Sequence, residues 1–118
     1  MIFKDNQPIY LQILELINSK IIAGEWKAEE RIPSVRDLAV EYEINPKTVV
    51  RVYDILQNNN IIYKKRGMGY YLSPSAYENT ISSSREDFVK NELPKLFSKL
   101  DELSISIDEL KQLYLRQK

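Results

Sequence analysis

The sequence predicts a mainly α-helical fold with one small β-hairpin. Two capped helical segments, separated by a short turn, lie between Ile32 and Arg51. Two short β-type segments then flank a basic, glycine-containing turn between Ile61 and Leu72, and amphipathic helical patterns follow in the remainder of the chain. Two adjoining helices followed by a hairpin define a winged helix-turn-helix. We therefore expect such a domain over residues 1–74 and a short C-terminal helical tail over residues 75–118.

The first helix is predicted from Pro8 to Ala23. Proline is tolerated in the first turn of a helix, and Gly24 is the typical kind of residue just beyond a helix end. Trp26 is expected to fold against this helix as part of the core. The predicted apolar stripe consists of Ile9, Leu11, Ile13, Leu14, Leu16, Ile17, Ile21 and Ile22.

Two helix starts organise the segment from Ile32 to Arg51. Ser34 is a favourable N-cap for one helix, and Asn45 followed by Pro46 begins a second helix that is expected to end near Asn58. Between and beyond these caps the apolar residues recur at helical spacing. They are Val35, Leu38, Ala39 and Tyr42 in the first helix, and Val49, Val52, Tyr53 and Leu56 in the second. This pattern is typical of a helix-turn-helix; an ordinary helical hairpin is the alternative.

A β-hairpin is predicted directly after the second of these helices. Ile61–Tyr63 forms one strand, Lys64–Gly69 the turn, and Tyr70–Leu72 the returning strand, which Pro74 closes. A hairpin at this place is the wing of a winged helix. Gly67-Met68-Gly69 is also compatible with a phosphate-binding loop, but no helix follows it, which disfavours that interpretation.

The composition excludes several classes of function. The chain contains neither Cys nor His, which removes disulfides, zinc fingers, thiol nucleophiles and imidazole bases. Only carboxylates remain for catalysis, and they form no paired constellation, so we expect no enzyme and no cofactor. The sequence has neither a signal peptide pattern nor a membrane-spanning apolar run, so we expect a cytoplasmic protein without a membrane partner.

Basic residues are concentrated in one part of this neutral chain. The formal net charge is zero, with 17 basic and 17 acidic residues. Between Asn45 and Pro74, however, five basic residues oppose the single acid Asp54, a local charge of +4. Such a basic region on a neutral body favours local attraction to a polyanion, with affinity that falls as salt rises. The five residues are Lys47, Arg51, Lys64, Lys65 and Arg66.

The tail carries two amphipathic helical patterns. One helix is predicted to begin at Ser84, with a kink or a fresh start at Pro94, and Ser106 and Glu109 form a capping box for a second. Helices this short cannot bury their apolar faces alone, so we expect dimerisation; a monomer whose core the tail completes is the alternative. The candidate dimerisation residues are Phe88, Val89, Leu93, Leu96, Phe97, Leu100, Leu103, Leu110, Leu113 and Tyr114.

Several motifs, taken together, resemble the N-terminal domain of the GntR family of bacterial transcription regulators. They are Pro8-Ile9-Tyr10, Gly24, Ile32-Pro33-Ser34-x-Arg36-x-Leu38-Ala39, Thr48-Val49 and Arg66-Gly67-x-Gly69. Asn45-Pro46-Lys47-Thr48-Val49 and the short tail are similar to the YtrA subgroup. The resemblance implies a homodimeric, sequence-specific DNA-binding regulator, with repression as the expected effect and an inverted repeat in double-stranded DNA as the expected operator.

Candidate DNA contacts follow from the helix geometry and from this resemblance. Lys47, Val50 and Arg51 lie on the helix face opposite the apolar stripe, where they can reach base edges or phosphates. Thr48 offers its hydroxyl near the positive end of the helix dipole, and Arg36 is implied by the family motif. The predicted contact residues are Arg36, Asn45, Pro46, Lys47, Thr48, Val50, Arg51, Lys64, Lys65, Arg66 and Gly67, of which Lys65 could instead point away through strand alternation.

The chain departs from the family pattern at five residues. Ala28-Glu29 stands where the family has Pro-Gly, Glu43 and Asn60 stand where Gly is common, and Tyr70 replaces a small hydroxyl residue. A positive φ at Glu43 would cost on the order of 1 kcal/mol.

Two functional questions stay open at this point. A winged-helix protein–protein interaction module without DNA binding is the alternative function. The tail is too small to enclose a metabolite pocket of roughly 300 Å3. A small-molecule effector of unknown identity, bound between subunits or between the tail and the winged helix, is still a further hypothesis, motivated by the predicted hinge at Pro94 and the apolar surface of the tail.

Overall fold

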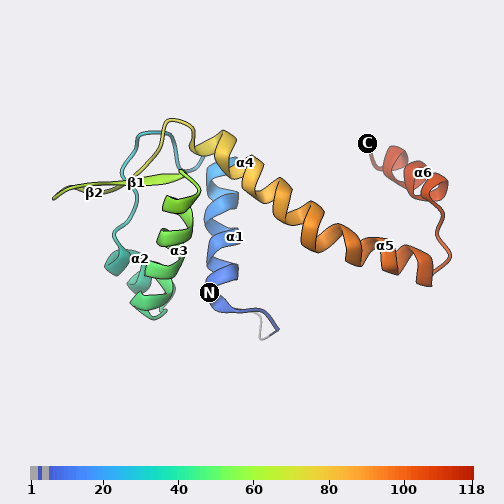
Figure 1. Cartoon of the computed structure of the whole chain (residues 1–118), viewed down its shortest axis with the longest axis horizontal. Helices are drawn as coiled ribbons and strands as arrows, with labels where there is room; N and C mark the ends of the chain where they lie inside the picture. Colours follow the sequence, from blue (N-terminus) through green and yellow to red (C-terminus); the bar gives the residue numbers. More distant parts are fainter. Residues whose placement is uncertain (1–2, 4–5) are drawn as a thin grey trace. The chain divides into compact units, whose positions relative to one another are not determined.

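The computed structural model describes Phe3 and residues 6–118. The chain divides into two compact units, Met1–Ser84 and Arg85–Lys118, and each is described by itself. Figure 1 shows the elements of each unit in chain order. The first unit contains α1 (Ile9–Ile22), α2 (Val35–Tyr42), α3 (Pro46–Asn58), β1 (Ile62–Lys65), β2 (Gly69–Leu72) and most of α4 (Ala76–Asp87). The second contains the end of α4, the π-helical turn η1 (Phe88–Glu92), α5 (Leu93–Glu102) and α6 (Ile107–Gln117).

The three N-terminal helices begin where the sequence predicts. The Ser34 hydroxyl accepts the Asp37 N–H at 3.0 Å at the start of α2, and the Asn45 side-chain oxygen accepts the Lys47 N–H at 2.9 Å at the start of α3. Gly24 follows α1 with a φ of +80°, the left-handed conformation expected just beyond a helix end. The predicted helix-turn-helix is confirmed.

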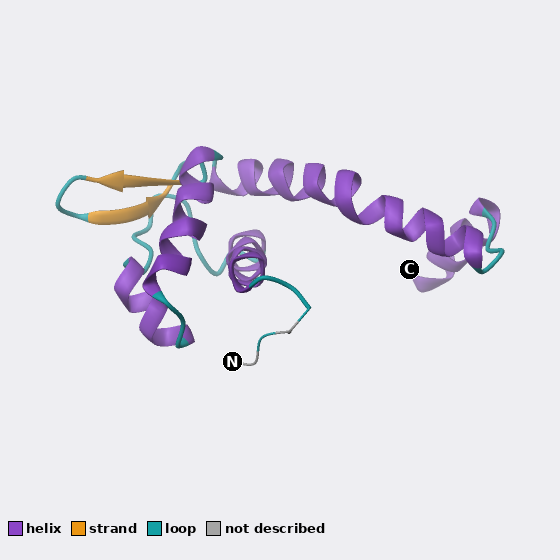
Figure 2. Cartoon of the chain, turned by 60° about the horizontal axis from the view of Figure 1, so that its bottom comes forward, coloured by secondary structure: helices purple, strands orange, loops and turns teal. Residues whose placement is uncertain are grey.

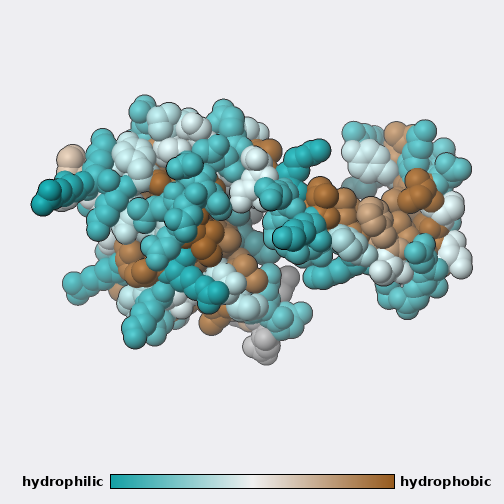
Figure 3. Space-filling model, viewed as in Figure 1, coloured by the Kyte–Doolittle hydropathy of each residue, from teal (hydrophilic) through white to brown (hydrophobic). Residues whose placement is uncertain are grey.

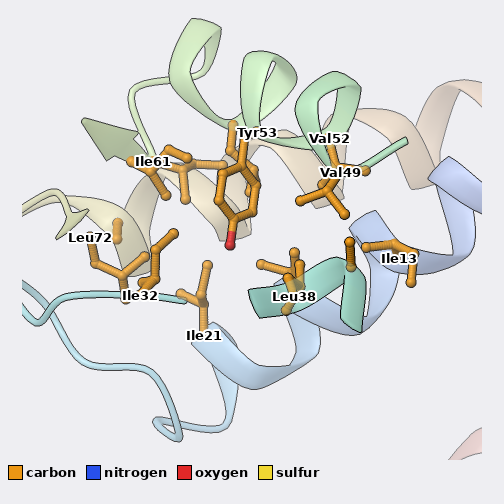
Figure 4. Close-up of a cluster of buried hydrophobic side chains, with 14 residues drawn as sticks. Ile13, Ile21, Ile32, Leu38, Val49, Val52, Tyr53, Ile61 and Leu72 are labelled. Carbon is orange, nitrogen blue, oxygen red and sulfur yellow. The ribbon is translucent and has the colours of Figure 1, made fainter. Parts of the chain in front are cut away.

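The core lies where α1, α2, α3 and the hairpin meet (Figure 4). Tyr53 is its largest fully buried side chain, and its hydroxyl donates a 2.7 Å hydrogen bond to the Pro33 carbonyl oxygen. This bond joins the middle of α3 to the segment that leads into α2. Trp26 packs partly buried against the core, as predicted. The fully buried side chains include Ile13, Ile17, Leu38, Val49, Val52, Leu56, Ile61 and Leu72.

The hairpin is longer than the sequence analysis predicted. β1 and β2 pair antiparallel from Ile62 with Leu72 to Lys65 with Gly69, so Lys64 and Lys65 lie in a strand and not in the turn. The segment before α2 adds an isolated bridge between Arg31 and Tyr71. We call the hairpin and its turn, residues 62–72, the wing. Figure 2 shows the wing extending past the neighbouring helices to a free tip.

The prediction that a helix begins at Ser84 is wrong, because α4 already begins at Ala76. Ala76 and Thr80 are buried, and the Asn79 side chain donates a 2.9 Å hydrogen bond to the Asn60 carbonyl oxygen just beyond α3. Ser73 donates to the same oxygen at 2.8 Å. The first turns of α4 are therefore held by the end of α3, a tertiary contact that local periodicity does not reveal.

The second unit contains the predicted irregularity near Pro94. The chain forms the π-helical turn η1 at Phe88–Glu92, and Pro94 then lies in the first turn of α5. A proline ring clashes with the carbonyl group four residues earlier in an α-helix, and a wider turn removes that clash. Ser106 is the N-cap of α6 as predicted, with the Glu109 N–H donating to the Ser106 hydroxyl at 3.1 Å, which is one of the two hydrogen bonds of a capping box.

Candidate nucleic-acid interface

The exposed side of α3 carries the predicted contact residues. Val49, Val52 and Leu56 are buried on one side of the helix, while Lys47, Val50 and Arg51 face solvent. We call the exposed residues Pro46, Lys47, Val50, Arg51 and Asp54 the reading face. It lies on the first two turns of α3, next to the positive end of the helix dipole.

Asn45 and Thr48 support the start of this helix. Asn45 is the N-cap, and the Thr48 N–H donates to the Asn45 carbonyl oxygen at 2.9 Å. Thr48 is half-buried, so its side chain is less accessible than those of the reading face. Both residues therefore hold the helix start in place beside Lys47.

Arg51 has a partner that the sequence analysis did not identify. Its guanidinium carbon lies 3.6 Å from the centre of the Tyr10 ring in α1, a cation–π contact. The ring limits the directions that the guanidinium can take while leaving Arg51 exposed. Tyr10 belongs to the Pro8-Ile9-Tyr10 motif, but no sequence signal indicated a contact across 41 positions.

The wing presents its basic residues on two sides. Lys64 lies on the side of Tyr70, with its ammonium 5.6 Å from that ring, and Tyr70 in turn packs edge-on against the buried Tyr53. Lys65 lies on the other side, with its ammonium 4.4 Å from the Tyr71 ring. The alternation that the sequence suggested for Lys65 is confirmed, so the five basic residues do not all share one face.

Arg66 and Gly67 form the exposed tip of the wing together with Met68. Gly67 adopts a φ of +76°, a conformation that glycine adopts without strain, and the Met68 N–H donates to the Lys65 carbonyl oxygen at 2.9 Å. The predicted residue Arg36 is exposed in the first turn of α2. The structure thus places Arg36 and the reading face on two different helices of one helix-turn-helix.

Three of the residues that depart from the family pattern adopt left-handed backbone conformations. Glu29, Glu43 and Asn60 have φ values of +65°, +54° and +58°, respectively. These are left-handed conformations that glycine adopts more easily than residues with a side chain. The backbone therefore keeps the glycine-type turns although the glycines are absent.

Among the described residues there is no group of three or more carboxylates that could hold a metal ion. No helix in the described part of the chain is long and apolar enough to span a membrane. A shallow hollow of about 100 Å3 is lined by Glu25, Trp26, Lys27, Glu30, Arg31 and Ile32.

Three helices, a hairpin wing and an exposed basic face on the third helix define the winged helix-turn-helix class of DNA-binding proteins. The model of the gntR family of bacterial regulatory proteins matches residues 9–72. The chain belongs to the GntR family of DNA-binding transcription regulators.

The similarity to individual members extends into the tail. The chain is 30% identical to the transcriptional repressor YtrA of Bacillus subtilis over 107 residues, which cover 91% of this chain and 82% of YtrA. This likeness confirms the resemblance to the YtrA subgroup.

Solved structures of GntR-family regulators have the same fold over nearly the whole chain. A regulator from Listeria monocytogenes has a TM-score of 0.77 at 32% identity, covering 97% of this chain and 98% of that one. A regulator from Bacteroides thetaiotaomicron has a TM-score of 0.76 at 40% identity, covering 94% of this chain and all of that one. The DNA-binding domain of AraR in complex with operator ORX1 has a TM-score of 0.57 at 22% identity, covering 61% of this chain and 93% of that domain, which shows a shared fold.

Proposed function

We propose that this protein is a homodimeric, cytoplasmic repressor that binds an inverted-repeat operator. The observation that carries this proposal is the reading face of α3, which is exposed and basic while the opposite side of the helix is fully buried. A helix of this kind enters the major groove with its N-terminal turns. Repression is the proposed effect on transcription because the relative YtrA is a transcriptional repressor.

The reading face offers distinct kinds of DNA contact. Lys47 and Arg51 are donors for guanine O6 and N7 or for phosphate, and Val50, 44% exposed, is an apolar partner for a thymine methyl group. Arg36 and the Thr48 hydroxyl are proposed to contact the DNA backbone, and Asn45 and Pro46 to set the start of the helix. The wing residues Lys64, Lys65, Arg66 and Gly67 are proposed to contact phosphates or the minor groove.

DNA binding is tested by fluorescence anisotropy with the DNA upstream of the protein's own gene. Arg51→Ala should weaken binding by about 5- to 150-fold, the range for loss of one bidentate base contact. Asn58→Ala, an exposed change at the far end of the same helix, is the matched control and should bind like the wild type. Absent or salt-insensitive binding of the wild type would contradict the proposal.

The tail is proposed to form the dimer. In the second unit most apolar side chains are exposed; Phe97, for example, is 48% exposed and Leu103 is 56% exposed. Leu100, by contrast, is buried, with only 6% of its surface exposed. Figure 3 shows hydrophobic surface gathered over α5 and α6. Covering such surface is favourable by about 25 cal/mol per Å2, and a second copy of the tail offers a matching apolar face.

The dimer is tested by light scattering after size-exclusion chromatography. Phe97→Asp should give a monomer, whereas Ser98→Asp, the adjacent exposed position, should leave a dimer. The monomer should bind a half-site like the wild type but lose the added affinity for two half-sites about one helical turn apart. A wild type that is monomeric at all concentrations would contradict this part of the proposal.

As part of the same proposal, residues 1–74 form the DNA-binding domain and residues 75–118 form the dimerisation tail. An effector is proposed only as an unidentified small molecule. Titration of candidate metabolites against the operator complex tests it, and operator affinity that no metabolite changes would contradict it.

A further inference from the structure

The two faces of the wing differ in what they contact. Ile62, Tyr70 and Leu72 face the core, where Ile62 and Leu72 are buried. Strand alternation places Tyr63, Lys65, Gly69 and Tyr71 on the opposite face, which we call the outer wing face. Tyr63 and Tyr71 stack there with ring centroids 6.0 Å apart. The outer wing face therefore carries a stacked pair of aromatic rings.

Arg31 reaches this face from the segment that precedes α2. Its backbone forms a bridge with Tyr71, and on either side of it the Leu72 N–H donates to the Glu30 carbonyl oxygen and the Ile32 N–H donates to the Tyr70 carbonyl oxygen, both at 3.0 Å. These two hydrogen bonds form the isolated antiparallel bridge that fixes this segment beside β2. The backbone of Arg31 is therefore held beside the wing.

The Arg31 side chain occupies the space that Gly69 leaves free. A Cβ atom at Gly69 would lie 3.2 Å from the Arg31 Nε and 3.3 Å from its Nη2. Because that Cβ would project from the outer wing face, the guanidinium lies on this face near the tip. Gly69 is thus the residue that admits Arg31.

Lys65 supplies a second cation on the same face. It is the cross-strand partner of Gly69, and its ammonium lies 4.4 Å from the centre of the Tyr71 ring. The ion pairs of the described residues are Lys20–Glu25, Lys95–Glu92 and Lys99–Glu102, so neither Arg31 nor Lys65 is neutralised within that part of the chain. Two cations on one face, both next to Gly69 and neither paired with a described carboxylate, favour an anion at this place.

We propose that Arg31 and Lys65 together bind one backbone phosphate of duplex DNA on the outer wing face. The inference rests on the proposed DNA-binding function and adds Arg31, which lies outside the sequence-predicted contact set, to it. The exposed tip residues Arg66 and Gly67 continue the same basic surface, so a duplex that meets the tip brings its phosphates to this face. The contact is to phosphate and carries no base preference.

Anisotropy titrations of Arg31→Ala test the inference on the upstream DNA and on an unrelated duplex. Loss of one phosphate contact should weaken binding by about five- to tenfold on both duplexes near 0.1 M salt and reduce the salt slope by about one. Lys27→Ala, an exposed cation four positions earlier, is the matched control and should change neither quantity. Arg31→Met keeps an unbranched stem over Gly69 without the charge, so it separates charge from packing if Arg31→Ala unfolds.

Ethylation interference locates the phosphate. In each half-site one phosphate whose ethylation weakens the wild type should have no effect on Arg31→Met. Unchanged affinity and salt slope in both Arg31 variants, with intact wild-type binding, would overturn this inference and leave the proposed function standing. A changed base preference would overturn the phosphate assignment, and a wild type that binds no DNA would overturn both.

Discussion

The Arg51 guanidinium of α3 lies 3.6 Å above the centre of the Tyr10 ring of α1. The contact joins the reading face to a helix that carries none of the sequence-predicted DNA contacts. An unrestrained arginine loses rotamer entropy when it binds a base, and a side chain already held over a ring loses less. We therefore expect Tyr10 to position Arg51 for its proposed DNA contact.

Replacing Tyr10 by Ala should weaken DNA binding through the position of Arg51. An exposed cation–π contact is worth about 0.5–1 kcal/mol, which corresponds to a two- to fivefold loss of affinity. Anisotropy titration measures the loss, and Tyr10→Phe, which keeps the ring, is the control. In an Arg51→Ala background the Tyr10→Ala change should have no further effect, and an additive loss would contradict the positioning role.

Replacing Tyr53 by Phe should destabilise the first unit. The change removes the donor of the 2.7 Å, partly buried hydrogen bond to the Pro33 carbonyl oxygen, and such a bond contributes about 0.5–1.5 kcal/mol. Urea unfolding followed by circular dichroism measures this free energy. Equal stability of Tyr53→Phe and the wild type at neutral pH would contradict the role of the bond.

The buried Tyr53 should also make the free energy of unfolding depend on pH in the alkaline range. Burial, followed by the nearby Tyr70 hydroxyl, raises the pKa of Tyr53 above its ordinary value of about 10. The unfolded chain therefore releases this proton first. The contribution is complete below pH 10 and is lost at about 1.4 kcal/mol per pH unit as the pH rises above it. The stability difference between the wild type and Tyr53→Phe should shrink above pH 10; a constant difference would contradict the assignment.

The parts of this fold that the sequence predicts correctly are those set by interactions between residues close together in the chain. Ser34 and Asn45 cap their helices with their own side chains, so the starts of α2 and α3 follow from neighbouring residues. The start of α4 depends instead on Asn79 and Asn60, which are 19 positions apart in the chain. The segment after Pro74 is polar and buries only small residues, so its periodicity is weak.

In the candidate site, too, some features follow from neighbouring residues in the sequence and others depend on contacts between distant segments. The exposure of Lys47 and Arg51 follows from helix periodicity and is visible in the sequence. The placement of Arg31 over Gly69 depends on a β-bridge between segments 40 positions apart, Arg31 and Tyr71. No local pattern encodes such a contact, which is why Arg31 was absent from the predicted set.

Replacing Glu43 by Gly should stabilise the first unit by about 0.5–1 kcal/mol. Glu43 ends α2 with a φ of +54°, a conformation in which glycine avoids the steric cost of a side chain. Glu41→Gly, two positions earlier inside the same helix, is the control and should destabilise by about 1 kcal/mol. Urea unfolding measures both; a loss of stability with Glu43→Gly would show that the left-handed turn is not strained.

Replacing Pro94 by Ala should convert η1 into regular α-helix. The π-helical turn at Phe88–Glu92 widens the chain one turn before the proline, and alanine both restores the missing N–H and removes the clash with the earlier carbonyl group. We expect a stronger helical circular dichroism signal at 222 nm and slower amide exchange across η1. Ser98→Ala, an exposed change within α5, should leave exchange in η1 unchanged. If Pro94→Ala also leaves that exchange unchanged, the π-helical turn has a cause other than the proline.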